Sequence, residues 1–266
     1  MSTASTTTRS TRHDGRGFRE LRRPEIQVGF HRPSEGSVLY RAGGTVVLCT
    51  ASVDAKVPPF LEGKGQGWVT AEYQMHPRAN PPRRESRDGR GKAPSGRTQE
   101  IQRLVGRALR AAVDLASMGE RQISIDCDVL EADGGTRTAS ITGGFLALAL
   151  ALDLLKRRGD LITPVLRMPV AAISVGHVNG AHALDLVYVE DSRARVDLNV
   201  VATETHEIVE IQGTAEGHPV PRNEVDRMVD LALEGIGQLC GLQRSTLAGA
   251  GVDLDALLRR PEEVPA

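Results

Sequence analysis

Hydrophobic and polar positions along the first half of the chain predict strands followed by a helix, a further strand and a second helix. Alternating or continuous β-rich runs indicate strands, whereas apolar residues at helical spacing indicate amphipathic helices. The segment Ala42-Gly43-Gly44 separates two β-rich runs and predicts a hairpin. The expected elements are two strands within 35–53, a strand within 67–75, a helix over 98–118, a strand over 122–133 and a helix over 140–156.

The second half of the chain repeats this order of strands before helix. Asn179-Gly180 joins two β-rich runs and is typical of a tight hairpin, and residues 196–216 predict two more strands. Apolar residues at helical spacing predict a last helix over 222–242. The pattern therefore predicts an α+β fold, with the two halves as a candidate structural duplication although no direct repetition of the sequence is visible.

The two ends of the chain differ in composition from the part between them. Residues 1–14 are rich in Ser and Thr and are expected to form a disordered tail, whereas residues 15–247 are expected to form the folded domain. From residue 248 to 266 the Asp, Glu and Pro content predicts a loose segment. We expect a cytoplasmic protein with no membrane partner, because no stretch reaches about 20 apolar residues and the N-terminus lacks an apolar signal core.

Composition restricts the function classes. The chain has 266 residues with 33 Lys plus Arg against 34 Asp plus Glu, so total charge does not hold it to a nucleic acid. Aromatic residues make up 3%, which argues against base recognition by stacking ladders. Cys49, Cys127 and Cys240 lack the paired spacing of metal ligands and are expected to be reduced core thiols.

Two predicted helix starts carry the features of anion sites. Gly134, Gly135, Thr136 and Arg137 precede an apolar helix, where free backbone N–H groups and the arginine could bind phosphate. The alternative is an ordinary loop with a good N-cap. The segment 95–98 places Arg97 at the start of the preceding helix and supplies a second such site.

The most basic stretch of the chain lies just before that helix. Residues 77–98 are rich in Arg, Pro and Gly, which predicts a surface loop whose guanidinium groups contact the phosphates of a polyanion. A solvated linker is the alternative. The cationic residues of this stretch are Arg78, Arg83, Arg84, Arg87, Arg90, Lys92 and Arg97, opposed only by Glu85 and Asp88.

Asp191 and Asp197 flank a short turn between predicted strands. Mg²⁺ is commonly held by one or two carboxylates and a substrate phosphate, so the pair is a candidate metal site, with two solubilising surface acids as the alternative. The sequence has no dinucleotide fingerprint, Walker loop, zinc-protease helix or nucleophile elbow, which argues against a nucleotide-dependent kinase and a covalent hydrolase.

Ordered blocks of the sequence resemble the bacterial ribonuclease PH family of phosphorolytic 3′ exoribonucleases. The resemblance runs from about Arg16 to Leu247 and includes "VPPFLEGKGQGWVTAEYQMHPRA", "SGRTQEIQRLVGRALRAAVDL", "IDCDVLEADGGTRTASITGGF" and "LDLVYVEDSRARVDLNVV". It implies duplicated βαβα units like the second domain of ribosomal protein S5, in a homohexamer built as a trimer of dimers. It also implies trimming of tRNA precursors, with ribosomal RNA as a further candidate, by inorganic phosphate that releases nucleoside diphosphates.

The resemblance also assigns roles to residues. Arg97, Gly135, Thr136 and Arg137 correspond to the family's phosphate-binding residues, and Asp191 and Asp197 to its catalytic acids, which hold Mg²⁺ or Mn²⁺. Arg78, Arg84 and Arg87 correspond to its tRNA-contacting arginines. The alternative is a catalytically silent, RNA-binding ring subunit, as found in exosomes; such subunits lose site residues that this chain retains.

Overall fold

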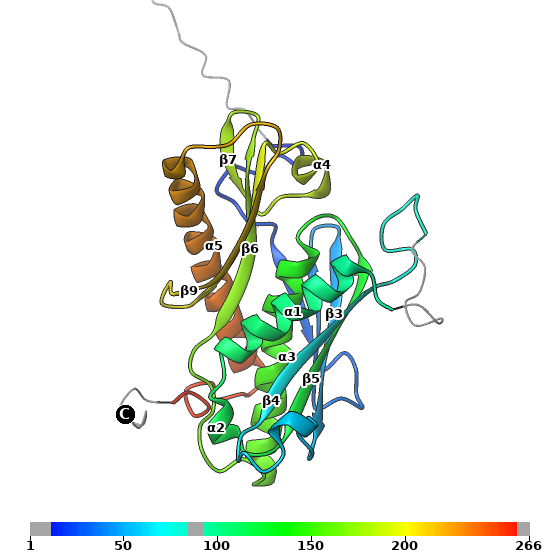
Figure 1. The fold of residues 1–266 in the computed structure, drawn as a ribbon, viewed down its shortest axis with the longest axis vertical. Helices are drawn as coiled ribbons and strands as arrows, with labels where there is room; N and C mark the ends of the chain where they lie inside the picture. The colour runs from blue at the N-terminus through cyan, green and yellow to red at the C-terminus, as the bar shows by residue number, and fades with distance from the viewer. Residues whose placement is uncertain (1–11, 85–92, 260–266) are drawn as a thin grey trace, which may run out of the picture.

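The first half of the molecule is a five-stranded sheet with helices. The structure, a computed structural model, describes residues 12–84 and 93–259. Its first sheet has the order β1-β2-β3-β5-β4; neighbours are antiparallel except for the parallel pair β4 and β5 (Figure 1). The elements are β1 Pro24–Val28, β2 Gly36–Ala42, β3 Thr45–Asp54, η1 Pro59–Leu61, β4 Trp68–Met75, α1 Gly96–Ala111, α2 Leu115–Met118, β5 Gln122–Glu131 and α3 Thr136–Arg158.

The second half is a four-stranded antiparallel sheet of order β7-β6-β8-β9, packed against the long helix α5. Asn179 and Gly180, with φ of 51° and 81°, form the tight turn of its first hairpin, as the sequence predicts. The elements are β6 Val170–Val178, β7 Ala181–Leu184, α4 Tyr188–Asp191, β8 Val196–Thr203, β9 Ile208–Ala215 and α5 Arg222–Gly249.

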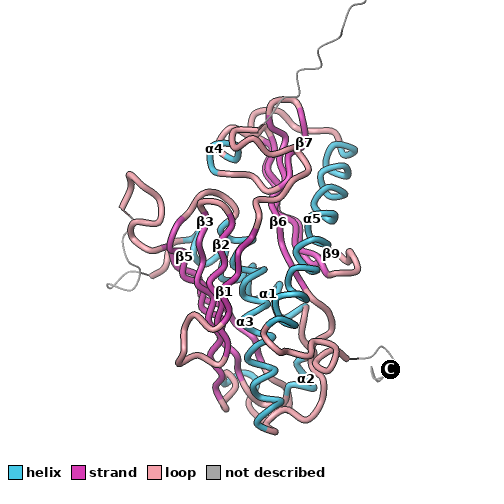
Figure 2. Tube along the Cα trace, turned by 180° about the vertical axis from the view of Figure 1, so that it is seen from behind, coloured by secondary structure: helices cyan, strands magenta, loops and turns pink. Residues whose placement is uncertain are grey.

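Helix α3 joins the two halves. It packs on β2, β3 and β5 of the first sheet and on β6 and α5 of the second half, so it runs through the middle of the molecule (Figures 1 and 2). Its side chains are buried on nearly every side, which explains why this part of the sequence is apolar almost without interruption. By length and composition α3 could cross a membrane, but 89% of its most apolar window is buried inside the protein, as in a core helix.

Each half contains a sheet with a hairpin and a helix packed on it, as the strand-before-helix pattern of the sequence predicts. The two sheets differ in one respect: β4 and β5 are parallel, whereas every strand pair of the second sheet is antiparallel. The α+β architecture expected from the sequence is therefore present. The three cysteines are free and buried, as expected.

The predicted helix over 98–118 is interrupted in the structure. Helix α1 ends at Ala111, and the Asp114 carboxylate accepts a hydrogen bond from the Ala116 N–H at 3.2 Å, which starts the separate helix α2. Val113, between them, forms a β-bridge with Leu166. Apolar residues continue across the break because Val113 and Met118 are buried in the same core cluster as the apolar side of α1.

Both chain ends contain more packed structure than composition suggests. Helix α5 extends to Gly249, and the segment after it buries Leu257, whose carbonyl oxygen accepts hydrogen bonds from Val165 and Leu166 at 3.1 and 2.9 Å. This differs from the loose segment expected from residue 248; residues 260–266 lie outside the described part. Arg12, expected in the tail, is buried and pairs with Glu190, whereas residues 1–11 lie outside the described part.

Candidate functional site

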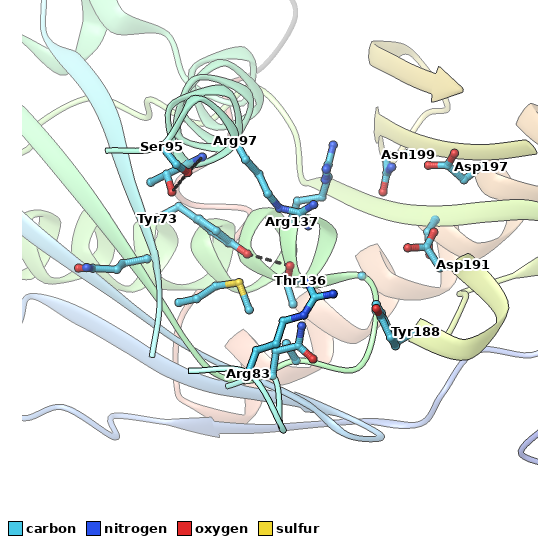
Figure 3. A pocket seen from close by; sticks show the side chains of 18 residues that line it. Tyr73, Arg83, Ser95, Arg97, Thr136, Arg137, Tyr188, Asp191, Asp197 and Asn199 are labelled. Carbon is cyan, nitrogen blue, oxygen red and sulfur yellow. Dashed lines mark hydrogen bonds between the residues drawn. The ribbon is translucent and has the colours of Figure 1, made fainter. Parts of the chain in front are cut away.

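A cavity of about 510 Å³ lies between the two halves of the molecule. Its first wall comes from the starts of α1 and α3 and from β4, and its second wall from α4 and the start of β8 (Figure 3). The six residues expected to bind phosphate or act in catalysis all line it: Arg97, Gly135, Thr136, Arg137, Asp191 and Asp197. The fold therefore brings together residues separated by about a hundred positions in the sequence.

The start of α1 places Arg97 at the cavity. Ser95 is the N-cap, and its hydroxyl accepts a hydrogen bond from the Thr98 N–H at 3.1 Å. Arg97 lies in the first turn, where its side chain reaches toward Arg137 in the centre of the site (Figure 3). A helix start and an exposed guanidinium group thus favour an anion at the same position.

The start of α3 requires glycine. Gly134 and Gly135 have φ of 76° and 65°, in the left-handed region that other residues rarely adopt. A Cβ atom on Gly134 would lie 2.5 Å from the Leu186 carbonyl oxygen, because the loop passes directly against the second half. The glycine pair thus lets the backbone N–H groups at the start of α3 line the cavity between the two walls.

The two residues after the glycine pair are held by partners on both walls. The Thr136 hydroxyl and the Tyr73 hydroxyl form a hydrogen bond of 2.8 Å, and burial raises the pKa of Tyr73, so the phenol is neutral. Arg137 donates through Nη1 to Gln212 Oε1 on β9 at 3.0 Å and lies 3.4 Å from Glu100 Oε1. Arg137 therefore bridges the first wall to the second sheet.

The second wall carries the two acids. Asp191 is the last residue of α4, and Asp197 is the second residue of β8. Burial raises the pKa of Asp191, while Arg137 and Arg97 oppose that rise. Burial and the like charge of Asp191 raise the pKa of Asp197, again opposed by Arg137. The two carboxylates are therefore close enough to repel each other and face the arginines of the first wall.

The chemistry of this pair fits a divalent cation. Mg²⁺ and Mn²⁺ prefer oxygen ligands, and Mg²⁺ is typically held by one or two carboxylates with the remaining positions taken by water and substrate phosphate. Within residues 12–84 and 93–259 no group of three or more His, Cys, Asp or Glu side chains could hold a metal ion. Asp191 and Asp197 could thus hold a cation that is shared with a bound phosphate rather than enclosed by the protein.

The basic loop is only partly described. Arg78 and Arg84 are exposed, and Arg87 lies outside the described residues. Arg83, a basic residue of this loop to which the family resemblance assigns no role, lines the cavity, and its guanidinium group points toward the start of α3 (Figure 3). The sequence identifies the stretch as basic, but composition does not tell which of two adjacent arginines turns inward.

Tyr73 and Asn199 also line the cavity and were not identified from the sequence. Tyr73 occupies a buried position of β4, where an aromatic residue indicates core packing. Asn199 lies two positions after Asp197 on β8, so the alternation of a strand places both side chains on one face. That spacing was the available signal for Asn199, whereas the sequence held none for the Tyr73 hydroxyl.

Solved structures with the same fold include a rice protein and two archaeal exosomes. Rice (Oryza sativa) Rrp46 is 16% identical, with a TM-score of 0.71 over 89% of this chain and 100% of that chain. An Archaeoglobus fulgidus exosome with RNA bound to the active site is 23% identical, with a TM-score of 0.69 over 86% and 91%. An archaeal exosome core is 21% identical, with a TM-score of 0.68 over 88% and 91%.

Family models match most of the chain, one in each half. Residues 20–152 match domain 1 of the 3′ exoribonuclease family, and residues 168–235 match domain 2. The first match ends within α3 and the second begins just before β6, so the boundary between them lies where the two halves of the fold join. The chain therefore belongs to the RNase PH family of 3′ exoribonucleases.

Proposed function

We propose that the protein is a phosphate-dependent 3′-to-5′ exoribonuclease that trims the 3′ ends of tRNA precursors and releases nucleoside diphosphates. One observation carries the proposal: a single cavity holds Arg97 and the segment 135–137 opposite Asp191 and Asp197. Phosphorolysis must bring two anions together, inorganic phosphate and an RNA phosphodiester. Cationic groups on one wall and a carboxylate pair on the other match that requirement.

The first wall binds and orients the nucleophile. Arg97, Arg137 and the N–H groups at the start of α3 hold inorganic phosphate and offset its repulsion from the RNA. A phosphate oxygen attacks the phosphorus of the last phosphodiester, and the bond from that phosphorus to the 3′ oxygen of the preceding nucleotide breaks. The terminal nucleotide leaves as a nucleoside diphosphate, and the 3′ oxygen takes up a proton to become the new RNA end.

The second wall acts on the transferred phosphoryl group. Asp191 and Asp197 would hold Mg²⁺ or Mn²⁺, which when bound stabilises negative charge on the phosphoryl oxygens. Burial raises the pKa of both carboxyl groups, so their charged forms are less favourable than those of exposed acids. A cation between them would relieve their mutual repulsion, so the pair gains more from binding it than two isolated surface acids would.

RNA and further copies of the chain are the proposed partners. Arg78 and Arg84 are exposed on the loop that carries Arg83 into the cavity, with Arg87 assigned the same role from the sequence alone, and their guanidinium groups suit a phosphate backbone. We assign the protein to the cytoplasm and its assembly to a homohexamer. In such a ring, basic loops of several subunits could hold one tRNA at the same time.

The alternative is a silent ring subunit that binds RNA without cleaving it, which the likeness to exosome structures fits. A 3′-extended tRNA incubated with and without inorganic phosphate separates the two, with products resolved by thin-layer chromatography. Nucleoside diphosphates that appear only with phosphate are expected. Monophosphates without phosphate would indicate hydrolysis, and RNA binding without any release would indicate the silent subunit. The same assay applies to Asp197→Asn, which alters one of the two acids of the cavity. Its matched control is Asp226→Asn, a substitution at an exposed position of α5.

A further inference from the structure

A buried ion pair lies behind the cavity. Arg22 precedes β1 and Asp185 follows β7; their relative exposures are 7% and 4%, and neither lines the cavity. Arg22 Nε donates to Asp185 Oδ2 at 3.0 Å, Nη2 donates to Oδ1, and the Arg22 backbone N–H donates to Oδ2 at 2.8 Å. Asp185 therefore accepts three hydrogen bonds from Arg22, two from the guanidinium group and one from the backbone N–H.

The same guanidinium group also holds the loop that leads into α3. Arg22 Nη1 donates to the Asp133 carbonyl oxygen at 2.7 Å. Thr45 Oγ1 completes this attachment, because it accepts from the Asp133 N–H at 3.0 Å and donates to the Gly134 carbonyl oxygen at 2.7 Å. The loop immediately before the proposed phosphate-binding segment is thus fixed by side chains from outside the cavity.

Asp185 fixes the segment that leads to the acids. It has a φ of 56°, and its N–H donates to the Ser174 carbonyl oxygen at 2.7 Å. Its own carbonyl oxygen accepts hydrogen bonds from Arg12 at 2.8 Å and Arg16 at 2.9 Å. Arg12 also pairs with Glu190, the residue before Asp191. A buried charge and three arginines thus hold the turn from which α4 carries Asp191.

We propose that Arg22 is a positioning residue that joins the two walls: by bonding Asp185 and the Asp133 carbonyl at once, it sets the distance between the phosphate-binding segment and Asp191. This inference rests on the proposed function. A planar guanidinium group can bond on two sides in fixed directions, whereas the ammonium group of lysine carries the same charge as a single point. A role in charge neutralisation alone would be met by lysine; a role in positioning would not.

Amide hydrogen exchange tests the inference without any need for turnover. Arg22→Lys and Arg22→Gln are compared with Arg19→Ala, which removes an exposed ion pair with Glu234 in the same N-terminal segment. Amide hydrogen exchange is measured at a temperature well below the unfolding midpoint of each variant. We expect the amides of 134–137 and 186–191 to exchange about tenfold faster or more in both Arg22 variants. In Arg19→Ala they should exchange as in the unaltered protein.

Phosphate binding is the second measurement. Titration calorimetry with inorganic phosphate should show an affinity about 10- to 100-fold weaker in Arg22→Lys, by analogy with the loss of a group that orients the ligands of a metal ion. Asp185→Asn retains the side-chain shape and tolerates a positive φ, so it provides the test if Arg22→Gln does not fold. Asp185→Asn should accelerate amide hydrogen exchange in both 134–137 and 186–191.

Two results would overturn the inference. Unaltered exchange and phosphate affinity in Arg22→Lys would show that Arg22 supplies charge alone. Faster exchange confined to one of the two segments would show that it does not join the walls. The proposed function fails separately: if the unaltered protein released no nucleoside diphosphate while both segments still responded together to Arg22→Lys, only the phosphorolytic assignment would be rejected.

Discussion

The two walls of the cavity come from the two halves of the fold and carry opposite charge. The first half contributes helix starts, where backbone N–H groups and Arg97 and Arg137 favour an anion. The second half contributes a short helix end and a strand start that carry Asp191 and Asp197. The two halves thus meet at the cavity through different elements, and the opposite charges of the walls come from the residues that these elements carry.

The walls also differ in how their groups are held. Much of the anion site is backbone, and Gly134 and Gly135 are required there by conformation and close approach. The acids are side chains on a crowded surface that raises their pKa values. Substitutions on the first wall should therefore affect binding, whereas substitutions on the second wall should affect the reaction step.

The largest expected effect is that of Asp197→Asn, which keeps the side-chain shape and removes the charge. Turnover should fall by about 100-fold or more, equivalent to about 3 kcal/mol of barrier, if the carboxylate acts mainly in the transition state. Affinity for tRNA should remain within a few fold, because the basic loop is unchanged. Single-turnover rates and filter-binding constants measure the two quantities; near-normal turnover at saturating Mg²⁺ would remove the catalytic role.

Arg97→Ala should affect the opposite wall. Loss of a charge-assisted hydrogen bond to phosphate costs about 2 kcal/mol, so we expect the KM for phosphate to rise about 30-fold. Affinity for RNA should change much less. Equal weakening of both substrates in initial-rate titrations would place Arg97 on the RNA path, and the assignment of the first wall to phosphate would then be wrong.

Arg84→Ala should have a smaller effect, confined to RNA. Each phosphate contact on a single strand contributes a slope of about −0.7 to the dependence of log affinity on log salt, so the slope should flatten by about that amount. The KM for phosphate should stay unchanged. Arg222→Ala, at an exposed position on α5, is the control. An unchanged slope would favour the solvated-linker interpretation of the loop for Arg84.

The smallest expected effect concerns acids outside the cavity. Asp126 faces Glu72 across β4 and β5; burial and Asp128 raise the pKa of Asp126, and burial and Asp126 raise that of Glu72. A raised pKa in the folded state means that stability is lost as pH rises through that value. At pH 7, Asp126→Asn should therefore have a free energy of unfolding slightly larger than that of the unaltered protein, by less than about 1 kcal/mol. It should accordingly unfold at a slightly higher temperature.

That difference should disappear at low pH. Below the ordinary pKa of Asp, about 3.9, the carboxyl group is protonated in both states and contributes no charge repulsion. Thermal unfolding followed by circular dichroism at both pH values measures the effect. Turnover should stay unchanged, in contrast to Asp197→Asn, and a lower midpoint for Asp126→Asn at pH 7 would contradict the sign.

Local signals explain what could be predicted from the sequence. The hairpin at Asn179-Gly180 and the helix starts at Ser95 and Gly135 depend on residues within a few positions, so their chemistry is readable in the chain. The carboxylate pair was identified because both acids flank one turn. From these features the pairing of strands within hairpins and most residues of the proposed site could be predicted.

Long-range contacts explain what could not be predicted. Arg22 meets Asp185 across 163 positions, and Arg12 meets Glu190 across 178, so no pattern in either segment indicates that these arginines are buried. The inward turn of Arg83 likewise depends on the path of its loop. The break between α1 and α2 was missed because the Asp114 cap competes with a helical pattern that continues beyond it.

The course of α3 links ligand binding to the energetics of the whole molecule. Its first turn lines the anion site, and the rest of the helix is packed between both halves, so it cannot unfold while either half stays intact. A ligand bound only to the folded state stabilises it by about 2.7 kcal/mol at 100 times its dissociation constant. Phosphate, nucleoside diphosphates and RNA ends should therefore register as shifts in one cooperative melting transition, so the protein's own denaturation can rank its ligands.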